Sequence, residues 1–179
     1  MGGLLKLFTK KNIGNYTLIN KYVKLGKNSK IWHFCNIYGT AENPVIIGDN
    51  VQIGSYTEIK PDVKIGNDCR FQSYIFIPDG VEIGNMVFIG PNVVFTNDKY
   101  PSAIKTINKT WKMEKTIIGD NVTIGARTII GPGIKIGNFS FIGMGSVITK
   151  DVPEKAIVVG NPAKIIGYVE NKKYKNILK

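Results

Sequence analysis

The sequence offers few side chains for proton transfer or metal binding, which limits the reactions that the protein could catalyse. Its single histidine is His33, and histidine is a common general base near neutral pH. Two cysteines, Cys35 and Cys69, lie 34 residues apart and form no cluster with it. A zinc site needs three or four such ligands. We therefore predict no metal site, and His33 is the candidate general base.

A six-residue repeat must position these side chains. Aliphatic or aromatic residues recur at every sixth position from Ile47 to Phe95, and the spacing is also present from Ile13 to Ile37 and from Ile118 to Ile148. A helix with 3.6 residues per turn cannot use this period, whereas a β-solenoid can. We predict an all-β fold with three short strands per coil, in which stacked Ile and Val side chains fill the interior.

The other positions of the six have their own residue types. A glycine often follows the first residue, and we expect it to relieve a crowded corner with a positive φ. The fifth residue is small or β-branched, and both cysteines fall there. Their spacing places them in different coils and on different faces, so we predict two buried free thiols, a reducing compartment and a cytoplasmic location.

Interruptions of the repeat divide the chain into segments. Four extra residues near Asn43 predict a small bulge, and about twenty residues without the repeat predict an extruded loop over 96–116. We therefore expect an N-terminal segment at 1–12, the helix of coils at 13–152, and at 153–179 a C-terminal turn with a Lys-rich tail that caps the solenoid and contains one short helix.

The composition favours anionic partners without identifying one. The net charge of +11 suits phosphorylated small molecules, and it suits plain solubility equally well. The chain has no aromatic RNA-binding motif or helix-turn-helix pattern, so we predict no nucleic-acid partner. It also has no apolar run of about 18 residues, so we predict no membrane span.

Four motifs give the chain a resemblance to a known family. They are the Ile-Gly ladder, the extruded loop, GMGSVITKDVP at 143–153 and VVGNPAKIIG at 158–167. Together they resemble the hexapeptide-repeat acyltransferases, which are left-handed parallel β-helices. The segments IWHFCNI at 31–37 and GPNVVFTNDKYP at 90–101 are similar to nucleotide-sugar N-acetyltransferases of surface-polysaccharide synthesis, including lipopolysaccharide and O-antigen. The resemblance implies a homotrimer, acetyl-CoA, and a dTDP- or UDP-linked 3-amino sugar as acceptor.

The same resemblance implies where the ligands bind. Acetyl-CoA would lie along the prism, with backbone contacts at Ala126 and Met144. Its adenine end would meet the turn that contains Pro162 and Lys164, where Lys164 would face a phosphate as a point charge. Relatives often have a smaller residue where this chain has Met144. The sugar end would meet Gln72, Tyr74, Asp98, Tyr100 and His33.

The resemblance also implies a reacting centre at Asn97, the Asn of the FTN motif. Its amide would orient the amine or donate to the developing oxyanion. His33 and Asn97 both occupy the third position of a six, but ten sixes separate them, which is roughly 16 Å along the axis and on different faces. His33 is therefore a base, a substrate contact or a structural corner. An amino sugar is weakly basic, so transfer to it requires no protein base.

Rival functions remain open. An O-acetyltransferase of a glycan is the alternative enzyme, although the similar sugar O-acetyltransferases have a histidine in the extruded loop and this loop has none. The γ-class carbonic anhydrases have the same fold but need three histidines around zinc, and a chain with one histidine does not supply them at one site. A non-catalytic scaffold is the third reading; its mixed polar outward residues disfavour an ice-binding surface.

Overall fold

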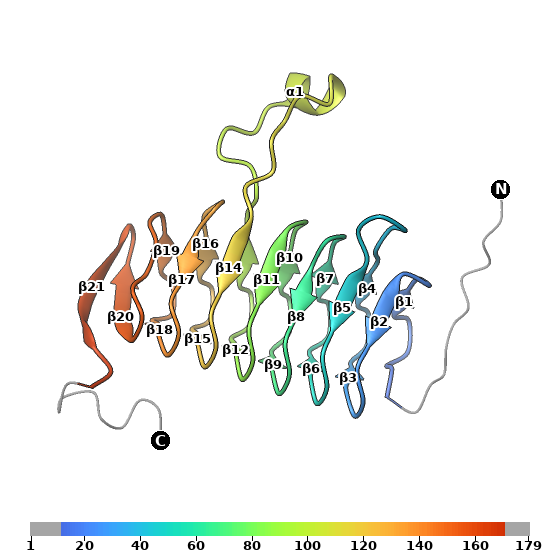
Figure 1. Ribbon diagram of the computed structural model, residues 1–179, viewed down its shortest axis with the longest axis horizontal. Coiled ribbons are helices and arrows are strands. Elements are labelled where there is room, and N and C mark those ends of the chain that lie inside the picture. Colours follow the sequence, from blue (N-terminus) through green and yellow to red (C-terminus); the bar gives the residue numbers. More distant parts are fainter. Residues whose placement is uncertain (1–11, 171–179) are drawn as a thin grey trace.

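A computed structural model describes residues 12–170 as a solenoid of stacked triangular coils (Figure 1). It is a left-handed parallel β-helix: the repeat predicts the β-solenoid, and the resemblance implies its left hand. Successive strands step around three faces, so strands three apart in the chain are hydrogen-bonded neighbours. Within the described residues, no helix is long and apolar enough to cross a membrane.

Each face is one sheet. Face A contains β3 (Lys30–Ile31), β6 (Gln52–Ile53), β9 (Arg70–Phe71), β12 (Phe88–Ile89), β15 (Thr123–Ile124), β18 (Phe141–Ile142), β20 (Ala156–Gly160) and β21 (Ala163–Tyr168). Face B contains β1 (Leu18–Ile19), β4 (Asn36–Ile37), β7 (Glu58–Ile59), β10 (Phe76–Ile77), β13 (Val94–Phe95), β16 (Ile129–Ile130) and β19 (Val147–Ile148). Face C contains β2 (Val23–Leu25), β5 (Val45–Ile47), β8 (Lys64–Ile65), β11 (Val81–Ile83), β14 (Thr116–Ile118) and β17 (Lys135–Ile136).

The first residue of each six forms the core. Ile53 pairs with Phe71, 18 residues later, whereas Ile37 pairs with Ile59 because the predicted bulge adds four residues to that coil. The paired side chains are buried and stack through the interior. Cys35 and Cys69 are buried and free, as the spacing predicts.

The corners correct the prediction about glycine. In almost every six the fourth residue has a positive φ, near +60°, and most of these residues are not glycine. The glycines at position two have other φ values, and their reason is close approach. A Cβ on Gly54 would lie 2.5 Å from the carbonyl carbon of Gln72 in the next coil. The corner is crowded, as predicted, but the left-handed residue is two positions later.

Three corners join the faces, and we name each by the faces it connects. The C–A corner has a regular sequence, with glycine at position two and Asn or Asp at position three in most coils. The side-chain oxygen of Asn67 accepts the N–H of Asp49 at 2.8 Å, and that of Asn85 accepts the N–H of Asn67 at 2.9 Å. This ladder satisfies backbone groups from coil to coil.

The B–C corner carries the extruded segment, residues 96–115, which we call the arm. It leaves the solenoid after β13, contains the short helix α1 (Ala103–Ile107) and returns at β14 (Figure 1). No residue of α1 is buried. The arm therefore lies outside the core, as the interrupted repeat predicts.

The C-terminal end differs from the predicted boundary at residue 152. Strand β20 still pairs in parallel with β18, and Ala156, Ile157 and Val158 are buried. These apolar side chains extend the core by one more strand. Strand β21 then folds back antiparallel on β20 as a hairpin, so the expected turn is a hairpin turn. The expected short helix of the tail falls on residues outside the described range, as do residues 1–11.

Candidate functional site

The A–B corner gathers half of the predicted site residues. His33, Gln72, Tyr74, Ala126 and Met144 all lie there, in four of its coils. Asn97, Asp98 and Tyr100 lie at the B–C corner and in the arm, so His33 and Asn97 occupy different corners, as their spacing predicts. Pro162 lies in the turn between β20 and β21, and Lys164 lies at the start of β21.

His33 is held by a backbone contact. Its Nδ1 atom accepts the N–H of Asn15 at 2.8 Å, from the coil before it. A neutral imidazole that accepts at Nδ1 carries its hydrogen on Nε2, so the free side of the ring donates. This geometry favours a hydrogen-bond donor to a ligand, or a structural corner, over a general base.

A groove lies beside His33 where the A–B corner meets face A. It measures about 350 Å³, and it is lined by Trp32, Gln52, Gly54, Ser55, Arg70, Phe71, Gln72 and Ser73. Trp32 is half exposed, whereas Gly54, at the same position of the next coil, is buried against the backbone of Gln72. A second hollow of about 370 Å³ on the other side of Trp32 includes Lys30 and His33.

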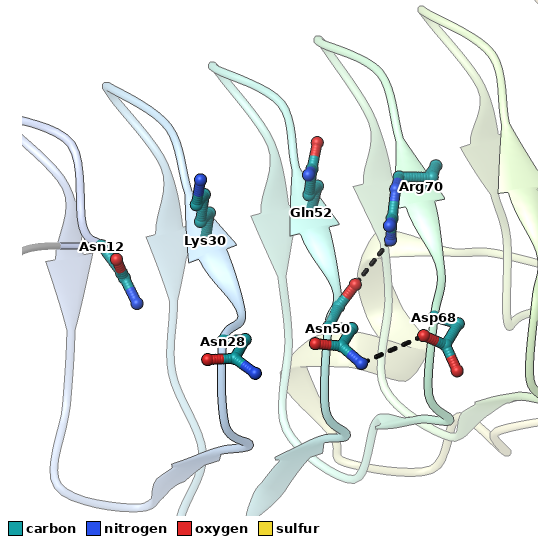
Figure 2. Close-up of a pocket in the computed structure, with 7 residues that line it drawn as sticks. All are labelled: Asn12, Asn28, Lys30, Asn50, Gln52, Asp68 and Arg70. Atoms are coloured by element: carbon teal, nitrogen blue, oxygen red, sulfur yellow. Dashed lines mark hydrogen bonds between the residues drawn. The ribbon is translucent and has the colours of Figure 1, made fainter.

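Face A continues this groove as a polar surface (Figure 2). Asn12, Lys30, Gln52 and Arg70 follow one another along the coils, beside a second row of Asn28, Asn50 and Asp68. An Arg70 Nη1 hydrogen bond to the Asn50 carbonyl, at 2.5 Å, directs the guanidinium along the face. Two cations and several amides can bind phosphate or sugar hydroxyls.

The sequence interpretation identified Gln72 in this groove but missed Trp32, Gln52, Lys30 and Arg70. Trp32 replaces the usual glycine of the second position, and the other three occupy the sixth position, whose outward side chains follow no repeat. The available signal was their spacing. Lys30, Gln52 and Arg70 are separated by one coil each, including the four-residue bulge.

Four aromatic rings form a column on the same corner, at position four of the same six in successive coils. Tyr16, Phe34, Tyr56 and Tyr74 stack with ring centroids 4.8 to 5.2 Å apart and nearly parallel planes. All four are exposed. The column ends at Tyr74, where the next coil has Asn92 at this position.

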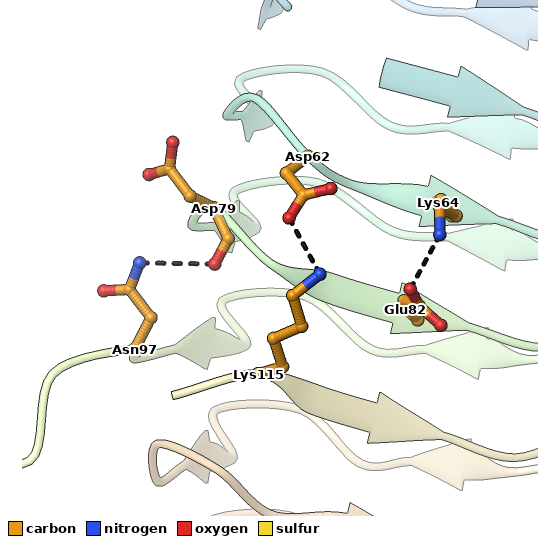
Figure 3. Close-up of polar contacts among 6 residues, drawn as sticks. All are labelled: Asp62, Lys64, Asp79, Glu82, Asn97 and Lys115. Carbon is orange, nitrogen blue, oxygen red and sulfur yellow. Dashed lines mark hydrogen bonds and ion pairs between the residues drawn. The ribbon is translucent and has the colours of Figure 1, made fainter. Parts of the chain in front are cut away.

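Asn97 closes the base of the arm (Figure 3). Its Nδ2 atom donates to the carbonyl of Asp79 at 3.2 Å, and its carbonyl accepts the N–H of Glu114 at 2.8 Å. Asp98 accepts the N–H of Tyr100, whose exposed ring lies 5.8 Å from both Lys99 and Lys105 Nζ atoms. Asn97 thus fixes where the arm starts, and no hydrogen bond between its Oδ1 atom and a described residue is found.

Ion pairs surround this base. Lys115 reaches Asp62 at 3.1 Å, and Lys64 reaches Glu82 at 2.8 Å across face C (Figure 3). The hydrogen bond to Glu82 raises the pKa of Lys64 above its usual range. Lys115 and Asp62 join the returning arm to the corner two coils before it. Among residues 12–170, no group of three His, Cys, Asp or Glu could hold a metal ion.

The hairpin extends the A–B corner towards the C-terminus. The N–H of Gly160 donates to Ser146 Oγ at 3.2 Å, and a Cβ on Gly143 would lie 2.6 Å from Val159. Met144, between these two contacts, is almost fully exposed. Ala126, Met144 and the hairpin turn with Pro162 and Lys164 therefore form one continuous line along the corner.

Comparisons with known proteins agree with this architecture. The model of the family "Bacterial transferase hexapeptide (six repeats)" matches residues 44–75 and 115–150. The bifunctional protein GlmU of Thermodesulfovibrio yellowstonii is 33% identical over 187 residues, covering 90% of this chain and 41% of that protein. The chain spans about 40% of the length of the curated relatives it matches first.

Two solved structures are similar in fold. A maltose O-acetyltransferase from Clostridium difficile 630 has a TM-score of 0.54 and 29% identity, covering 84% of this chain and 72% of its own. A GDP-perosamine N-acetyltransferase from Caulobacter crescentus, in complex with CoA and GDP-perosamine, has a TM-score of 0.58 and covers 87% of this chain and 54% of its own. Its identity of 18% establishes the likeness of fold alone.

Proposed function

Since the chain belongs to the bacterial transferase hexapeptide family, we propose that it transfers an acetyl group from acetyl-CoA to the amine of a nucleotide-linked amino sugar. The observation that carries this proposal is the A–B corner. It unites the line from Ala126 to Lys164 with the polar groove beside Trp32. One corner thus offers room for a long coenzyme and for a separate acceptor.

Acetyl-CoA occupies the C-terminal part of the corner in this proposal. Its pantetheine amides meet backbone groups at Ala126 and Met144, where the glycines of position two bring neighbouring coils close together. Exposed Lys164 and Pro162 meet the nucleotide end, and Lys164 neutralises a phosphate as a point charge. The thioester then points towards the N-terminal coils.

The acceptor occupies the N-terminal part of the corner. Arg70 and Lys30 balance the diphosphate, Trp32 stacks on a planar base, and Gln72 and the Nε2 hydrogen of His33 bind polar groups. Tyr74, at the end of the aromatic column, offers its remaining ring face to the sugar. These contacts suit an anionic, hydroxylated ligand.

Asn97 reaches this groove from a second copy of the chain. Face B lies between the A–B and B–C corners, and its outward side chains are mainly apolar: Leu18, Phe76, Val94, Ile129 and Val147. Three prisms that bury face B around a threefold axis place the A–B corner of one copy beside the B–C corner of the next. A homotrimer then completes each groove with Asn97, Asp98 and Tyr100 of a neighbour.

The position of His33 favours an amine over a hydroxyl. A sugar hydroxyl must lose a proton to a base, whereas part of the population of a weakly basic amine is already neutral near pH 7. The only histidine lies roughly 16 Å along the axis from Asn97 and uses its acceptor nitrogen on Asn15. The Asn97 amide then orients the amine or stabilises the oxyanion.

A thiol-release assay tests the reaction. With acetyl-CoA and a panel of dTDP-, UDP- and GDP-linked 3-amino and 4-amino sugars, we expect turnover with at least one amine. The Asn97→Ala variant should lose turnover by at least about tenfold, which is the scale of a lost transition-state donor. The matched control is Asn67→Ala, an Asn in the structural ladder of the C–A corner. Full activity of Asn97→Ala excludes Asn97 from the reacting centre.

Further variants separate the two ligands. Lys164→Ala should raise the KM for acetyl-CoA more than that for the sugar, whereas His33→Asn should raise the sugar KM and leave turnover nearly unchanged. A loss of turnover alone in His33→Asn indicates a base. A mixing experiment tests whether the site is shared between copies. Asn97→Ala subunits keep an intact Ala126, and Ala126→Trp subunits, which cannot bind the coenzyme, keep an intact Asn97. A mixed oligomer therefore contains some sites in which both residues are intact. Recovered activity in the mixed oligomer supports a site built from two copies.

An O-acetyltransferase is the second candidate, because the matched maltose O-acetyltransferase shares 29% of its residues with this chain. Turnover with a glycan hydroxyl, together with no turnover on any amine in the panel, would show that the protein is an O-acetyltransferase. Coenzyme binding with neither activity indicates a different acceptor. A thermal shift that does not respond to acetyl-CoA leaves the scaffold reading.

A further inference from the structure

Arg127 is a cation on the A–B corner that has no role in the proposed ligand contacts. It occupies position four of its six, between Ala126 and the face B strand β16, and its side chain is exposed. Its backbone N–H donates to the Pro91 carbonyl at 2.9 Å. Among residues 12–170, no ion pair or hydrogen bond of its guanidinium is found. The described A–B corner contains no Asp or Glu, so a partner for this cation must come from elsewhere.

Glu114 is in the complementary situation at the B–C corner, where the arm returns to the solenoid. Its side chain is half-buried, and a Cβ on Gly133 would lie 2.7 Å from its Oε2 atom, so the carboxylate extends to the next coil. Within the part of the chain that the structure describes, this carboxylate has no ion pair or hydrogen bond. Removing a carboxylate from water without a partner is costly, so Glu114 favours a cation beside it.

Arg127 and the carboxylate of Glu114 lie at the same height of the prism. Gly133, which the carboxylate contacts, belongs to the same coil as Arg127, the coil that contains β15, β16 and β17. Within one chain, face B separates the two corners. Around a threefold axis parallel to the prism, equal coils of neighbouring copies meet. Arg127 of one copy then lies beside Glu114 of the next.

The other acids on face B, face C and the B–C corner are occupied or lie too far along the axis. Three have a lysine partner in their own chain: Glu58, Glu82 and Asp62. Two already accept a backbone N–H: Asp98 and Asp151. Two lie at least two coils before Arg127: Glu42 and Asp79. Glu114 is therefore the acid that fits this cation best.

We propose that Arg127 of one copy pairs with Glu114 of the next and thereby positions Asn97 in the shared groove. The Glu114 N–H donates to the Asn97 carbonyl at 2.8 Å, so a fixed Glu114 also fixes the backbone of Asn97. A planar guanidinium can donate two parallel hydrogen bonds to one carboxylate. Arg127 is then a positioning residue that acts through Glu114 and touches neither ligand. This inference rests on the proposed function, in which two copies share each groove.

A charge exchange tests the pair. Steady-state kinetics and the Tm of the intact oligomer are measured for Arg127→Glu, for Glu114→Arg and for the variant with both substitutions. Each single variant should lower kcat about tenfold with little change in either KM, because Asn97 is displaced. The double variant should recover most of the lost kcat and Tm, because the pair forms again with its charges exchanged. Matched controls with the same charge changes are Lys135→Glu on face C and Glu154→Arg at the C–A corner.

Neutral variants keep the test independent of any misfolding caused by charge reversal. Arg127→Gln and Glu114→Gln should each lower kcat, and combining them should add little, since either one already breaks the pair. Fully additive losses, or no recovery in the charge exchange, would overturn the proposal. A raised KM for acetyl-CoA in the Arg127 variants alone would also overturn it and assign Arg127 to a coenzyme phosphate. If the parent protein acetylates no acceptor, the proposed function fails, and the pair is still decided by whether the losses in Tm are additive.

Discussion

The C–A and A–B corners have the same backbone turn and use it differently. Both have a left-handed residue at position four and a buried small residue at position five. At positions two and three the C–A corner has Gly followed by Asn or Asp in most coils, and those side chains bind the backbone of a neighbouring coil. The A–B corner has Trp, Gln or Gly followed by Asn, His, Ser, Pro, Ala or Met.

This difference separates structural from functional corners. The C–A ladder uses its polar side chains within the protein, so little hydrogen-bonding capacity is left for a ligand. On the A–B corner two coils lack a glycine at position two, and the larger residues there, Trp32 and Gln72, line the groove. A solenoid can therefore hold its backbone at one corner and carry its chemistry at another.

The largest expected effect comes from adding one methyl group at position two of the C–A corner. A Cβ on Gly48 would lie 2.5 Å from Asn67 Oδ1 and 2.7 Å from the Gly66 carbonyl oxygen. We expect Gly48→Ala to lower the free energy of unfolding by about 3 kcal/mol, measured in urea, because the crowding atoms belong to the ladder and the backbone.

The counterpart at position two of the A–B corner is Trp32→Ala. Trp32 is half exposed, so we expect a stability loss of at most about 1 kcal/mol and a raised KM for the acceptor. If Gly48→Ala is as stable as the parent protein, close approach between neighbouring coils does not explain why position two of the C–A corner is glycine. If Trp32→Ala leaves the acceptor KM unchanged, the groove is not the acceptor site.

The second-largest loss of stability is expected when the side-chain ladder at position three of the C–A corner is broken. Asn67→Ala removes the acceptor for the Asp49 N–H and should cost about 1 to 2 kcal/mol, with turnover unchanged. Ser73→Ala, at position three of the A–B corner, should change stability by less than about 0.5 kcal/mol. Equal costs in thermal unfolding would remove the distinction between the two corners.

The sequence predicted the backbone well because the period constrains it. Buried aliphatic residues six apart require three strands per coil, and the interruptions at Asn43 and after Phe95 gave the bulge and the arm. The glycine rule failed because composition alone does not distinguish a positive φ from close approach between coils. The end at residue 152 was too early because Ile157 and Val158 continue the core without a clear six.

The site was harder to predict, since ligand contacts depend on outward residues. The candidates His33 and Gln72 lie at the candidate groove, whereas Trp32 and Arg70, which also line it, were not among the candidates from the sequence. The contact from Asn15 to His33 joins adjacent coils, and of the three roles left open for the imidazole it favours a substrate contact or a structural corner over a base. The aromatic column was detectable in principle from its spacing of one coil per ring.

A smaller effect is expected at position four, in the aromatic column. Tyr56 stacks on Phe34 at 4.9 Å and on Tyr74 at 4.8 Å, and its ring is about half exposed. Tyr56→Ala should lower the free energy of unfolding by about 1 kcal/mol, because two partly exposed stacks are lost. Tyr56→Phe keeps both stacks and should be nearly neutral. A large loss for Tyr56→Phe would mean that the hydroxyl, and not stacking, stabilises the column.

The smallest effect is at position five, where the two corners should not differ. Cys35 at the A–B corner and Cys69 at the C–A corner each place Sγ 3.2 Å from a glycine carbonyl oxygen, and burial raises the pKa of both thiols. Above the unfolded thiol pKa of about 8.5, the unfolded chain loses these protons while the folded chain retains them. The folded state then binds more protons, so stability decreases as the pH rises through this range, and below it the thiols add no slope. The free energy of unfolding in urea at pH 7 and 9.5 should show a slope that Cys35→Ala and Cys69→Ala each reduce equally. If only one variant reduces the slope, the environments of the two buried thiols differ. The difference between the structural and the functional corner would then include their buried residues at position five.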